Sequence, residues 1–206
     1  MSTPAPTRKP YHGSCHCGAT RYLLFLTLPH APPPAAAAFP PPAGQPVPQM
    51  LYRCNCTICQ KTGFFHVRVP FAPDDFLVLS PSDPLTEQGD YQRGSKQLHF
   101  LFCKGCGVRT FTFMGEGERV EVDLGALGVE GEGVREVWRP RREGWAEGKG
   151  NGTYLSVNGQ TVEAGQGVDL GELVDGRGVL YYDYLELGGK AAKPGRYEGP
   201  YEYGCW

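Results

Sequence analysis

The chain has 206 residues, of which 40% are apolar, with 29 glycines and 19 prolines. This composition favours short strands and turns over long helices, and the length suffices for one domain with a sizeable core. A net charge of −2 gives no electrostatic reason to expect nucleic acid or an anionic membrane as a partner. No apolar run reaches the roughly 20 residues of a membrane helix, and the N-terminus has no apolar signal segment, so we expect an intracellular, cytoplasmic protein.

The first half of the chain predicts a meander of short antiparallel strands. Residues 1–10 have the composition of a flexible tail, and residues 30–49 form a proline- and alanine-rich stretch typical of a mobile surface insertion. Elsewhere, alternating apolar residues or a high content of β-branched and aromatic residues mark the strands. The predicted strands span residues 20–28, 66–71, 76–79, 98–102, 108–113 and 119–124.

Beyond residue 125 the strand pattern weakens, and we expect a loop-rich extension in which Trp138 and Trp145 anchor a wrapped segment. The Asn158-Gly159 pair suits the two left-handed positions of a type I′ turn, so it predicts a hairpin between two strand patterns. The elements predicted here are this hairpin over residues 153–163, a short helical turn over 169–175 and a strand over 179–187.

Four of the eight cysteines form two short pairs, each of which precedes a glycine. A zinc–thiolate bond is about 2.3 Å long, so tetrahedral sulfurs lie about 3.8 Å apart, and a glycine after the second ligand permits the tight turn that this requires. Two pairs from distant parts of the chain predict a closed, structural zinc site. The alternatives are a redox pair at Cys103 and Cys106, or His16 in place of one sulfur. The four predicted ligands are Cys15, Cys17, Cys103 and Cys106.

Three further cysteines, Cys54, Cys56 and Cys59, lie within the stretch CNCTIC. Three thiolates on one loop can bind a single zinc and leave an open position, which is what a catalytic zinc requires for water or a substrate atom. His66, His99 or Cys205 could instead supply a fourth protein ligand and close the site. The spacing therefore predicts a second zinc site but does not determine its fourth ligand.

The stretches GSCHCG, CNCTICQKTG and FCKGCGVRTF resemble the glutathione-dependent formaldehyde-activating enzyme family, also called the CENP-V/Gfa domain. The resemblance covers about residues 11–125, and the stretch NGTYLSVNGQTVEAGQ is similar to a longer, fungal-type form of these proteins. It implies a mainly β fold, the β-tent, in which zinc pins small antiparallel sheets together. Residues 126–206 would then be a loop-rich extension that packs on the same domain.

The same resemblance implies an activity and two zinc ions per chain. Members of the family are described as carbon–sulfur lyases, and the named reaction joins formaldehyde and glutathione as S-(hydroxymethyl)glutathione. It implies a structural zinc on the two cysteine pairs and a catalytic-type zinc on Cys54, Cys56 and Cys59, where the substrate sulfur would bind. The insertion at 30–49 and the chain beyond residue 125 could reshape this second site, so the substrate itself is an expectation.

Several other residues are candidates for contacts with a glutathione-like substrate. Glutathione carries two carboxylates, and Arg53 and Lys61 are the cations nearest to the three cysteines in the sequence. Proton transfer at the carbonyl oxygen needs a group that titrates near neutral pH, which His66 or His99 could supply. The partner that we expect is therefore a small thiol or its aldehyde adduct.

Two other classes of function fit parts of the sequence. One is a non-catalytic binding module, which stays open because a fold by itself does not decide function. In such a module both zinc ions would be structural. A methionine-sulfoxide-reductase-like enzyme would need a reactive cysteine that binds no metal, and Cys205 is the one left over. The sequence decides neither the direction of the reaction nor the oligomeric state.

Overall fold

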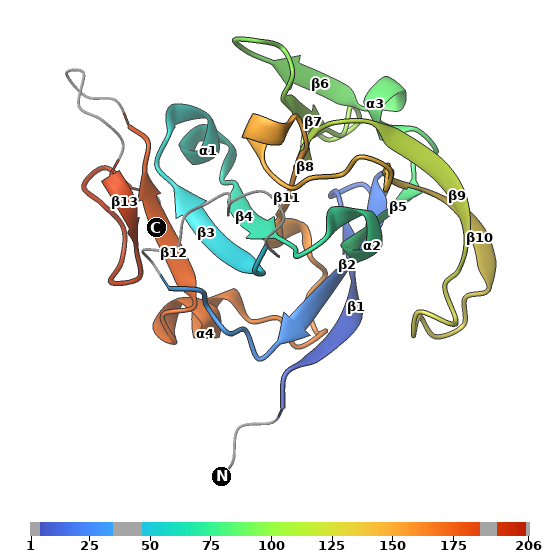
Figure 1. Cartoon of the computed structure of the whole chain (residues 1–206), viewed down its shortest axis with the longest axis horizontal. Helices are drawn as coiled ribbons and strands as arrows, with labels where there is room; N and C mark the ends of the chain where they lie inside the picture. Colours follow the sequence, from blue (N-terminus) through green and yellow to red (C-terminus); the bar gives the residue numbers. More distant parts are fainter. Residues whose placement is uncertain (1–4, 35–46, 186–192, 205–206) are drawn as a thin grey trace.

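The computed structural model describes residues 5–34, 47–185 and 193–204 of the chain. These residues form a mainly β structure in which two sheets pack against each other and short helices connect some of the strands (Figure 1). The mainly β class predicted from the sequence is confirmed. In the described part of the chain, no helix combines the length and apolar character of a membrane span.

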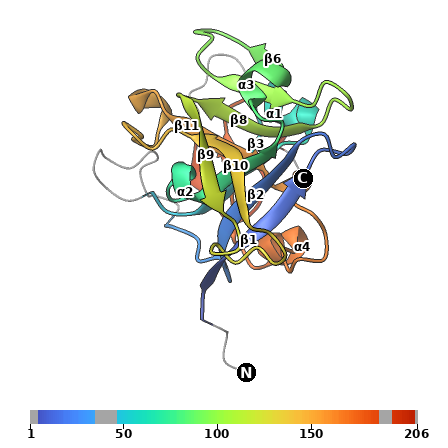
Figure 2. The same ribbon diagram turned by 90° about the vertical axis from the view of Figure 1, so that its right-hand side faces the viewer.

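The first sheet contains five strands, and all of its pairs are antiparallel. In spatial order the strands are β1 (Thr7–Ser14), β2 (Arg21–Leu28), β5 (Phe76–Ser80), β10 (Val134–Pro140) and β9 (Gly117–Asp123). The hairpin of β1 and β2 is paired along its whole length, from Thr7 opposite Leu28 to Ser14 opposite Arg21. Figure 2 views the molecule from the side on which β9 and β10 lie. The N-terminal hairpin therefore shares a sheet with strands that follow it by about a hundred residues.

In the described part of the chain, the second sheet contains eight strands, and the pairing of two of them is parallel whereas the others are antiparallel. In spatial order they are β13 (Lys193–Arg196), β12 (Val179–Asp183), β3 (Met50–Cys54), β4 (Phe65–Arg68), β11 (Tyr154–Asn158), β8 (Arg109–Met114), β7 (His99–Phe102) and β6 (Gly89–Gln92). The parallel pair is β12 and β3. β11, from the C-terminal part of the chain, pairs with both β4 and β8 and so lies inside the sheet.

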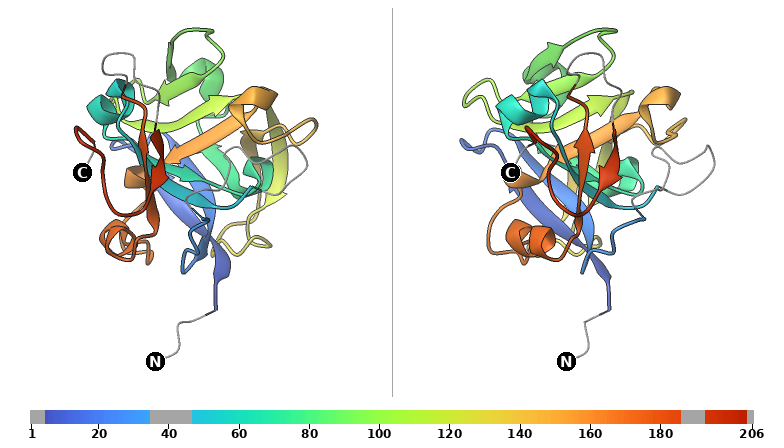
Figure 3. Two further views of the ribbon diagram at one scale, coloured as in Figure 1. Left: turned by 60° about the vertical axis from the view of Figure 1, so that its left-hand side comes forward. Right: turned by 90° about the vertical axis from the view of Figure 1, so that its left-hand side faces the viewer.

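The helices are all short. They are α1 (Thr57–Thr62), α2 (Ala72–Asp75), α3 (Pro84–Glu87) and α4 (Leu170–Asp175), with single 3-10 turns η1 (Lys149–Asn151) and η2 (Gly159–Thr161). α1 begins three residues after the end of β3, and Gly63 caps its C-terminus with a φ of 59°, which a glycine adopts without strain. In Figure 3, α1 and the strands β12 and β13 come forward on the same side of the molecule.

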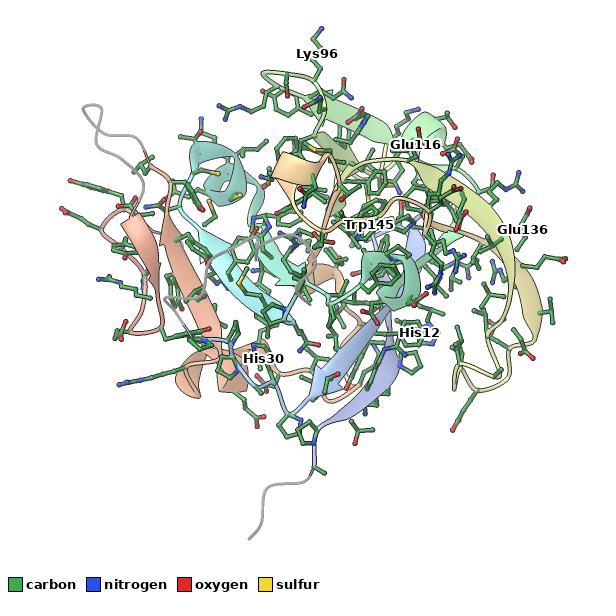
Figure 4. The ribbon with its side chains drawn as sticks, in the orientation of Figure 1. His12, His30, Lys96, Glu116, Glu136 and Trp145 are labelled. Carbon is green, nitrogen blue, oxygen red and sulfur yellow. The ribbon has the colours of Figure 1, made fainter. Side chains whose placement is uncertain are left out.

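The main hydrophobic core lies where the two sheets face each other. Phe76 of the first sheet packs against Phe111 of the second with ring centroids 4.9 Å apart, and Trp138 of the first sheet packs against Phe113 of the second at 5.2 Å. Trp145, labelled in Figure 4, stacks on Phe113 from a loop. Burial of large aromatic side chains contributes about 2 kcal/mol each or more, so these contacts hold the sheets together.

Two predictions for the C-terminal part need correction. The prediction of a hairpin at Asn158-Gly159 is wrong, because β11 ends at Asn158 and the 3-10 turn η2 follows. The side chain of Asn158 caps this turn by accepting the backbone N–H of Gln160. The stretch after residue 125 is not mostly loop, because β10 forms there and places Trp138 in the core. β10 forms because all seven of its residues find partners in β9, a pairing that local alternation does not reveal.

Other predicted segments agree in part or lie outside the described residues. β1 begins at Thr7, inside the predicted tail over 1–10. Residues 35–46 of the predicted insertion over 30–49 lie outside the described residues, as do Cys205 and residues 186–187 of the predicted strand. The division of the chain into a domain over 11–125 and an extension over 126–206 stays a prediction.

Candidate active site

The two cysteine pairs meet at one point between the two sheets. Cys15 and Cys17 lie in the turn between β1 and β2, whereas Cys103 and Cys106 lie in the turn between β7 and β8. Their four sulfurs all lie within 4.8 Å of one another, and we call them the four-cysteine cluster. Cys17 Sγ is 3.6 Å from Cys15 Sγ and 3.5 Å from Cys103 Sγ, close to the separation of sulfurs around a tetrahedral zinc.

The backbone around the four-cysteine cluster is suited to thiolates. Gly18 and Gly107, which follow the second cysteine of each pair, have φ angles of 74° and 75°, as the tight turns require. The backbone N–H of Thr20 donates to Cys15 Sγ at 3.2 Å. The backbone N–H of Val108 lowers the pKa of Cys106 to about 6, because it stabilises the thiolate.

The other three cysteines meet where β3 passes into α1. Cys54 ends β3, Cys56 is the N-cap of α1, and Cys59 lies within α1. Their sulfurs also lie within 4.8 Å of one another, and we call them the three-cysteine cluster.

The three-cysteine cluster favours one thiolate. The pKa of Cys56 falls to about 2, because the thiols of Cys54 and Cys59 donate to its sulfur and the backbone N–H groups at the start of α1 also point at it. The pKa of Cys54 rises to about 12, chiefly because of its hydrogen bond with Cys56, and the pKa of Cys59 rises because of its hydrogen bonds with Cys54 and Cys56. Such a group of soft donors suits zinc, whose positive charge would favour thiolates at all three positions.

A cavity of about 450 Å³ opens onto the three-cysteine cluster, within the range of small-ligand sites. Its lining comes from strands of the second sheet, from α1 and from the loops beside them. Apart from the three cysteines, the lining residues are Met50, Tyr52, Ile58, His66, Arg68, Arg93, Leu98, Phe100, Thr112, Lys149, Tyr154, Tyr182 and Tyr184. The cavity thus combines aromatic walls with three cationic side chains and has no acidic side chain among these residues.

His66 lies beside the cluster, and both of its ring nitrogens have hydrogen-bond partners, the sulfur of Cys59 and the hydroxyl of Ser156. Its Nε2 is 3.1 Å from Cys59 Sγ, its Nδ1 is 2.8 Å from Ser156 Oγ, and its ring stacks on Tyr52 at 4.2 Å. Burial lowers its pKa to about 3, so the ring is neutral near pH 7. If Ser156 donates to Nδ1, the single ring N–H lies on Nε2 and faces the sulfur of Cys59.

His99 lies away from the cavity. Its Nδ1 is 2.7 Å from Asp90 Oδ2, and Gln92 Nε2 also lies at 2.9 Å from the same nitrogen. The neighbouring side chains Leu98 and Phe100 line the cavity instead, because successive strand residues point in opposite directions. The structure therefore places His66, and not His99, beside the cysteines.

The cations at the cavity differ from those nearest in sequence. Arg53 lies over the ring of Phe65 at 5.2 Å, and Lys61 borders a different cavity beside Gly107. Instead, the guanidinium carbon of Arg68 lies 3.9 Å and Lys149 Nζ lies 4.6 Å from the ring centroid of Tyr154.

Arg68 is completely buried and forms an ion pair with Glu147. Lys149 is exposed at the mouth of the cavity. One sequence signal points to Arg68: it is two residues after His66 in a predicted strand, so both side chains lie on one face. No comparable signal marks Lys149 or Tyr154, which follow the cysteines by about a hundred residues.

The fold and the site define a mainly β protein with a four-cysteine and a three-cysteine cluster, the second of which opens into a ligand-sized cavity. Residues 43–148 match the family described as glutathione-dependent formaldehyde-activating enzyme, and the chain belongs to this family. The matched region contains the three-cysteine cluster but begins after Cys15 and Cys17. The chain is also similar to the crystal structure of a Rhodobacter sphaeroides protein, with 19% sequence identity and a TM-score of 0.41 over 79% of this chain and 94% of that chain.

Proposed function

We propose that the protein is a zinc-dependent carbon–sulfur lyase or synthase that acts on a thiol adduct such as S-(hydroxymethyl)glutathione. The observation that carries the proposal is the contrast between the two clusters. The four-cysteine cluster holds four ligand atoms, whereas the three-cysteine cluster holds three and faces a cavity of about 450 Å³. Four protein ligands are typical of structural zinc, and three protein ligands with an open position are typical of catalytic zinc.

Both clusters fit zinc by their donor chemistry and sulfur spacing. Cys15, Cys17, Cys103 and Cys106 would hold a structural ion, and Cys54, Cys56 and Cys59 a catalytic-type ion. When bound at the second cluster, zinc would supply a Lewis acid that stabilises negative charge on a substrate sulfur. His66 would keep Cys59 in place through its contact with Sγ.

The reaction needs a proton donor or acceptor at the oxygen of the aldehyde. In synthesis, the thiol gives up its proton and its sulfur attacks the carbonyl carbon, so that the carbon–sulfur bond forms. The carbonyl electron pair moves to the oxygen, which takes up a proton. Tyr52 and Tyr154 line the cavity, with their hydroxyl oxygens 2.7 Å apart, and Tyr184 lines it as well. Phenol hydroxyls donate hydrogen bonds at neutral pH, so we assign the contact with this oxygen to the tyrosines rather than to His66.

The cationic lining supports a substrate that carries carboxylates, as glutathione does. Lys149 and Arg93 are exposed at the cavity and can move to meet an anionic group. Arg68 is fixed by its ion pair with Glu147, and its buried positive charge contributes to the electrostatic potential in the cavity. In this proposal, Lys149, Arg93 and Arg68 attract the carboxylates of the substrate, the role that the sequence predicts for Arg53 and Lys61.

Thiol binding to the cobalt-substituted protein tests this function. We expect two metal ions per chain. The visible absorption of the three-cysteine cluster should change when glutathione is added, because the glutathione sulfur would coordinate the cobalt ion there. Cys56→Ser should abolish this change and keep the absorption of the four-cysteine cluster. If neither glutathione nor any other small thiol changes the spectrum, the proposed open position is wrong.

The alternative of a binding module with two structural zinc ions is favoured by one observation. Gln60 on α1 donates a hydrogen bond to the backbone carbonyl of Tyr203, two residues before Cys205. Cys205 itself lies outside the described residues, so its role as a fourth ligand stays a prediction. Cys205→Ser decides between the two functions: a changed cobalt spectrum in the absence of thiol would support the binding module, and an unchanged spectrum the enzyme.

A further inference from the structure

The three-cysteine cluster is tied to the C-terminal part of the chain through Asn55, the residue between Cys54 and Cys56. Asn55 is only 2% exposed. Its side-chain nitrogen donates to Asp183 Oδ1 at 2.7 Å, and its side-chain oxygen accepts the backbone N–H of Tyr184 at 2.7 Å. These two bonds use both ends of the buried amide.

The bonds of Asn55 extend a strand pairing into the cysteine loop. β12 runs parallel to β3, from Val179 opposite Leu51 to Tyr182 opposite Cys54. The backbone N–H of Asn55 then donates to the carbonyl of Tyr182 at 3.3 Å, one residue beyond the last pair. The first two cysteines of the cluster therefore lie at the end of this pairing and on either side of Asn55.

β12 lies outside residues 43–148, the region that matches the family, yet it reaches the site. Tyr182 and Tyr184, on either side of Asp183, both line the cavity above the cysteines. The segment 179–184 thus supports the loop from one side and forms part of the cavity wall. Sulfur ligands must keep their spacing within a few tenths of an ångström to bind one metal ion, and residues that hold the ligands strongly affect metal affinity.

We propose that Asn55 is a positioning residue, through which the segment 179–184 holds Cys54 and Cys56 in the arrangement that binds metal. The proposal rests on the proposed function in one respect, namely that the three-cysteine cluster binds a metal ion. It adds that the C-terminal part of the chain, beyond the family match, is a structural component of that metal site.

Metal release from the full-length, cobalt-loaded protein into an excess of a chromogenic chelator tests the proposal. The cobalt–thiolate absorption should decay in two phases, one for each cluster, and Cys56→Ser identifies the phase of the three-cysteine cluster. We expect Asn55→Ala to speed release from this cluster by about tenfold or more, because supporting partners of metal ligands typically change affinity by 10–100-fold. Release from the four-cysteine cluster should not change.

An exchanged pair separates positioning from general loss of stability. Asn55→Asp alone places a carboxylate next to that of Asp183 and should speed release, whereas Asn55→Asp combined with Asp183→Asn restores a donor and an acceptor. We expect the combined variant to release metal within about threefold of the wild-type rate, as a coupled pair requires. Asn158→Ala is the matched control, because Asn158 is a buried asparagine that bonds to the backbone N–H of Phe65 and the carbonyl of Arg109 instead.

The proposal is wrong if Asn55→Ala leaves release unchanged, if release accelerates equally at both clusters, or if the exchanged pair is no better than Asn55→Asp alone. Equal acceleration by Asn158→Ala at the three-cysteine cluster would likewise indicate a loss of fold stability. A wild-type protein with metal only at the four-cysteine cluster would overturn both this proposal and the proposed function. Two metal ions with thiol binding, but no effect of Asn55, would overturn the present proposal alone.

Discussion

Lys149 and Arg68 place two positive charges over the ring of a single tyrosine, Tyr154, and among the described residues Glu147 forms an ion pair with Arg68 but not with Lys149. Like charges that converge on one ring repel each other, and an anionic ligand would relieve this repulsion. Arg68 is buried with its partner Glu147, so removing its charge would leave a buried carboxylate unpaired and destabilise the fold as well as change the cavity. Lys149 is exposed, and its substitution should affect the ligand without unfolding the protein.

We therefore predict that Lys149→Glu weakens the binding of a carboxylate-bearing thiol. Glutathione should bind the cobalt-substituted variant about tenfold less tightly, because the new charge repels the carboxylates of the ligand. 2-Mercaptoethanol, which has no carboxylate, should bind within about twofold of its wild-type affinity. Spectroscopic titration of both thiols measures the two dissociation constants.

Lys61→Glu makes the same change of charge at the lysine that is nearest to Cys59 in sequence but borders another cavity. We expect little change for either thiol. A larger loss of glutathione affinity in Lys61→Glu than in Lys149→Glu would mean that the ligand occupies a different place from the cavity described above.

At the scale of elements, β10 shows how a strand with little local signal becomes part of the core. Its residues pair with β9 along their whole length, and Trp138 also lies opposite Val78 of β5. Gly117 at the start of β9 lies under the Trp138 indole, where an added Cβ would come within 2.3 Å of ring atoms. The strand is therefore held by a close contact between a tryptophan and a glycine on neighbouring strands.

Trp138→Ala should consequently destabilise the whole protein. The indole is 3% exposed and packs against Phe111 and Phe113 of the opposite sheet. Removing it should lower the free energy of unfolding by about 3–5 kcal/mol, as large-to-small substitutions of buried aromatic residues do. Urea denaturation monitored by circular dichroism measures this loss.

The matched control in the same strand is Val134→Ala, because Val134 is 69% exposed. Its effect should stay within about 0.5 kcal/mol. If both variants lose the same free energy of unfolding, Trp138 does not contribute to the core as described.

For the whole molecule, the four-cysteine cluster joins the turns of two hairpins that belong to different sheets. Cys15 and Cys17 belong to the first sheet's hairpin of β1 and β2, and Cys103 and Cys106 to the second sheet's hairpin of β7 and β8. A metal ion at this point would link distant parts of the chain, since Cys17 and Cys103 are 86 residues apart in the sequence. The three-cysteine cluster, by contrast, comes from one continuous stretch of the chain, residues 54–59, at the end of β3 and the start of α1.

Loss of metal from the four-cysteine cluster should therefore affect stability far more than loss from the three-cysteine cluster. We expect Cys103→Ser to lower Tm by roughly 10 °C or more, since several kcal/mol of metal-binding free energy contributes to folding. Cys56→Ser should lower Tm by only a few degrees and abolish thiol binding. Scanning calorimetry of both variants at equal metal content in the buffer measures the difference, and equal shifts would contradict the division into a structural and a catalytic-type site.

Much of the site could be predicted because its chemistry is concentrated in short, local patterns. Cys54, Cys56 and Cys59 lie within six positions, and each cysteine pair precedes a glycine with positive φ, so spacing predicts the trio and the two pairs. The fold then brings the two pairs together, although Cys17 and Cys103 are 86 residues apart. Strands with clear alternation, such as β8 and β9, could be predicted for the same reason.

Tertiary structure decided which distant residues complete the cavity. His66 and His99 were equivalent candidates in the sequence, but sheet pairing places only His66 beside Cys59. Lys149 and Tyr184 reach the cavity from the C-terminal part of the chain, through a loop and through β12, whose parallel pairing with β3 no local pattern encodes. The sequence by itself thus determined the local grouping of cysteines that could hold a metal ion, because this grouping depends on spacing within a turn. Only the fold determined the cations and aromatic walls around it, because these depend on which strands become neighbours.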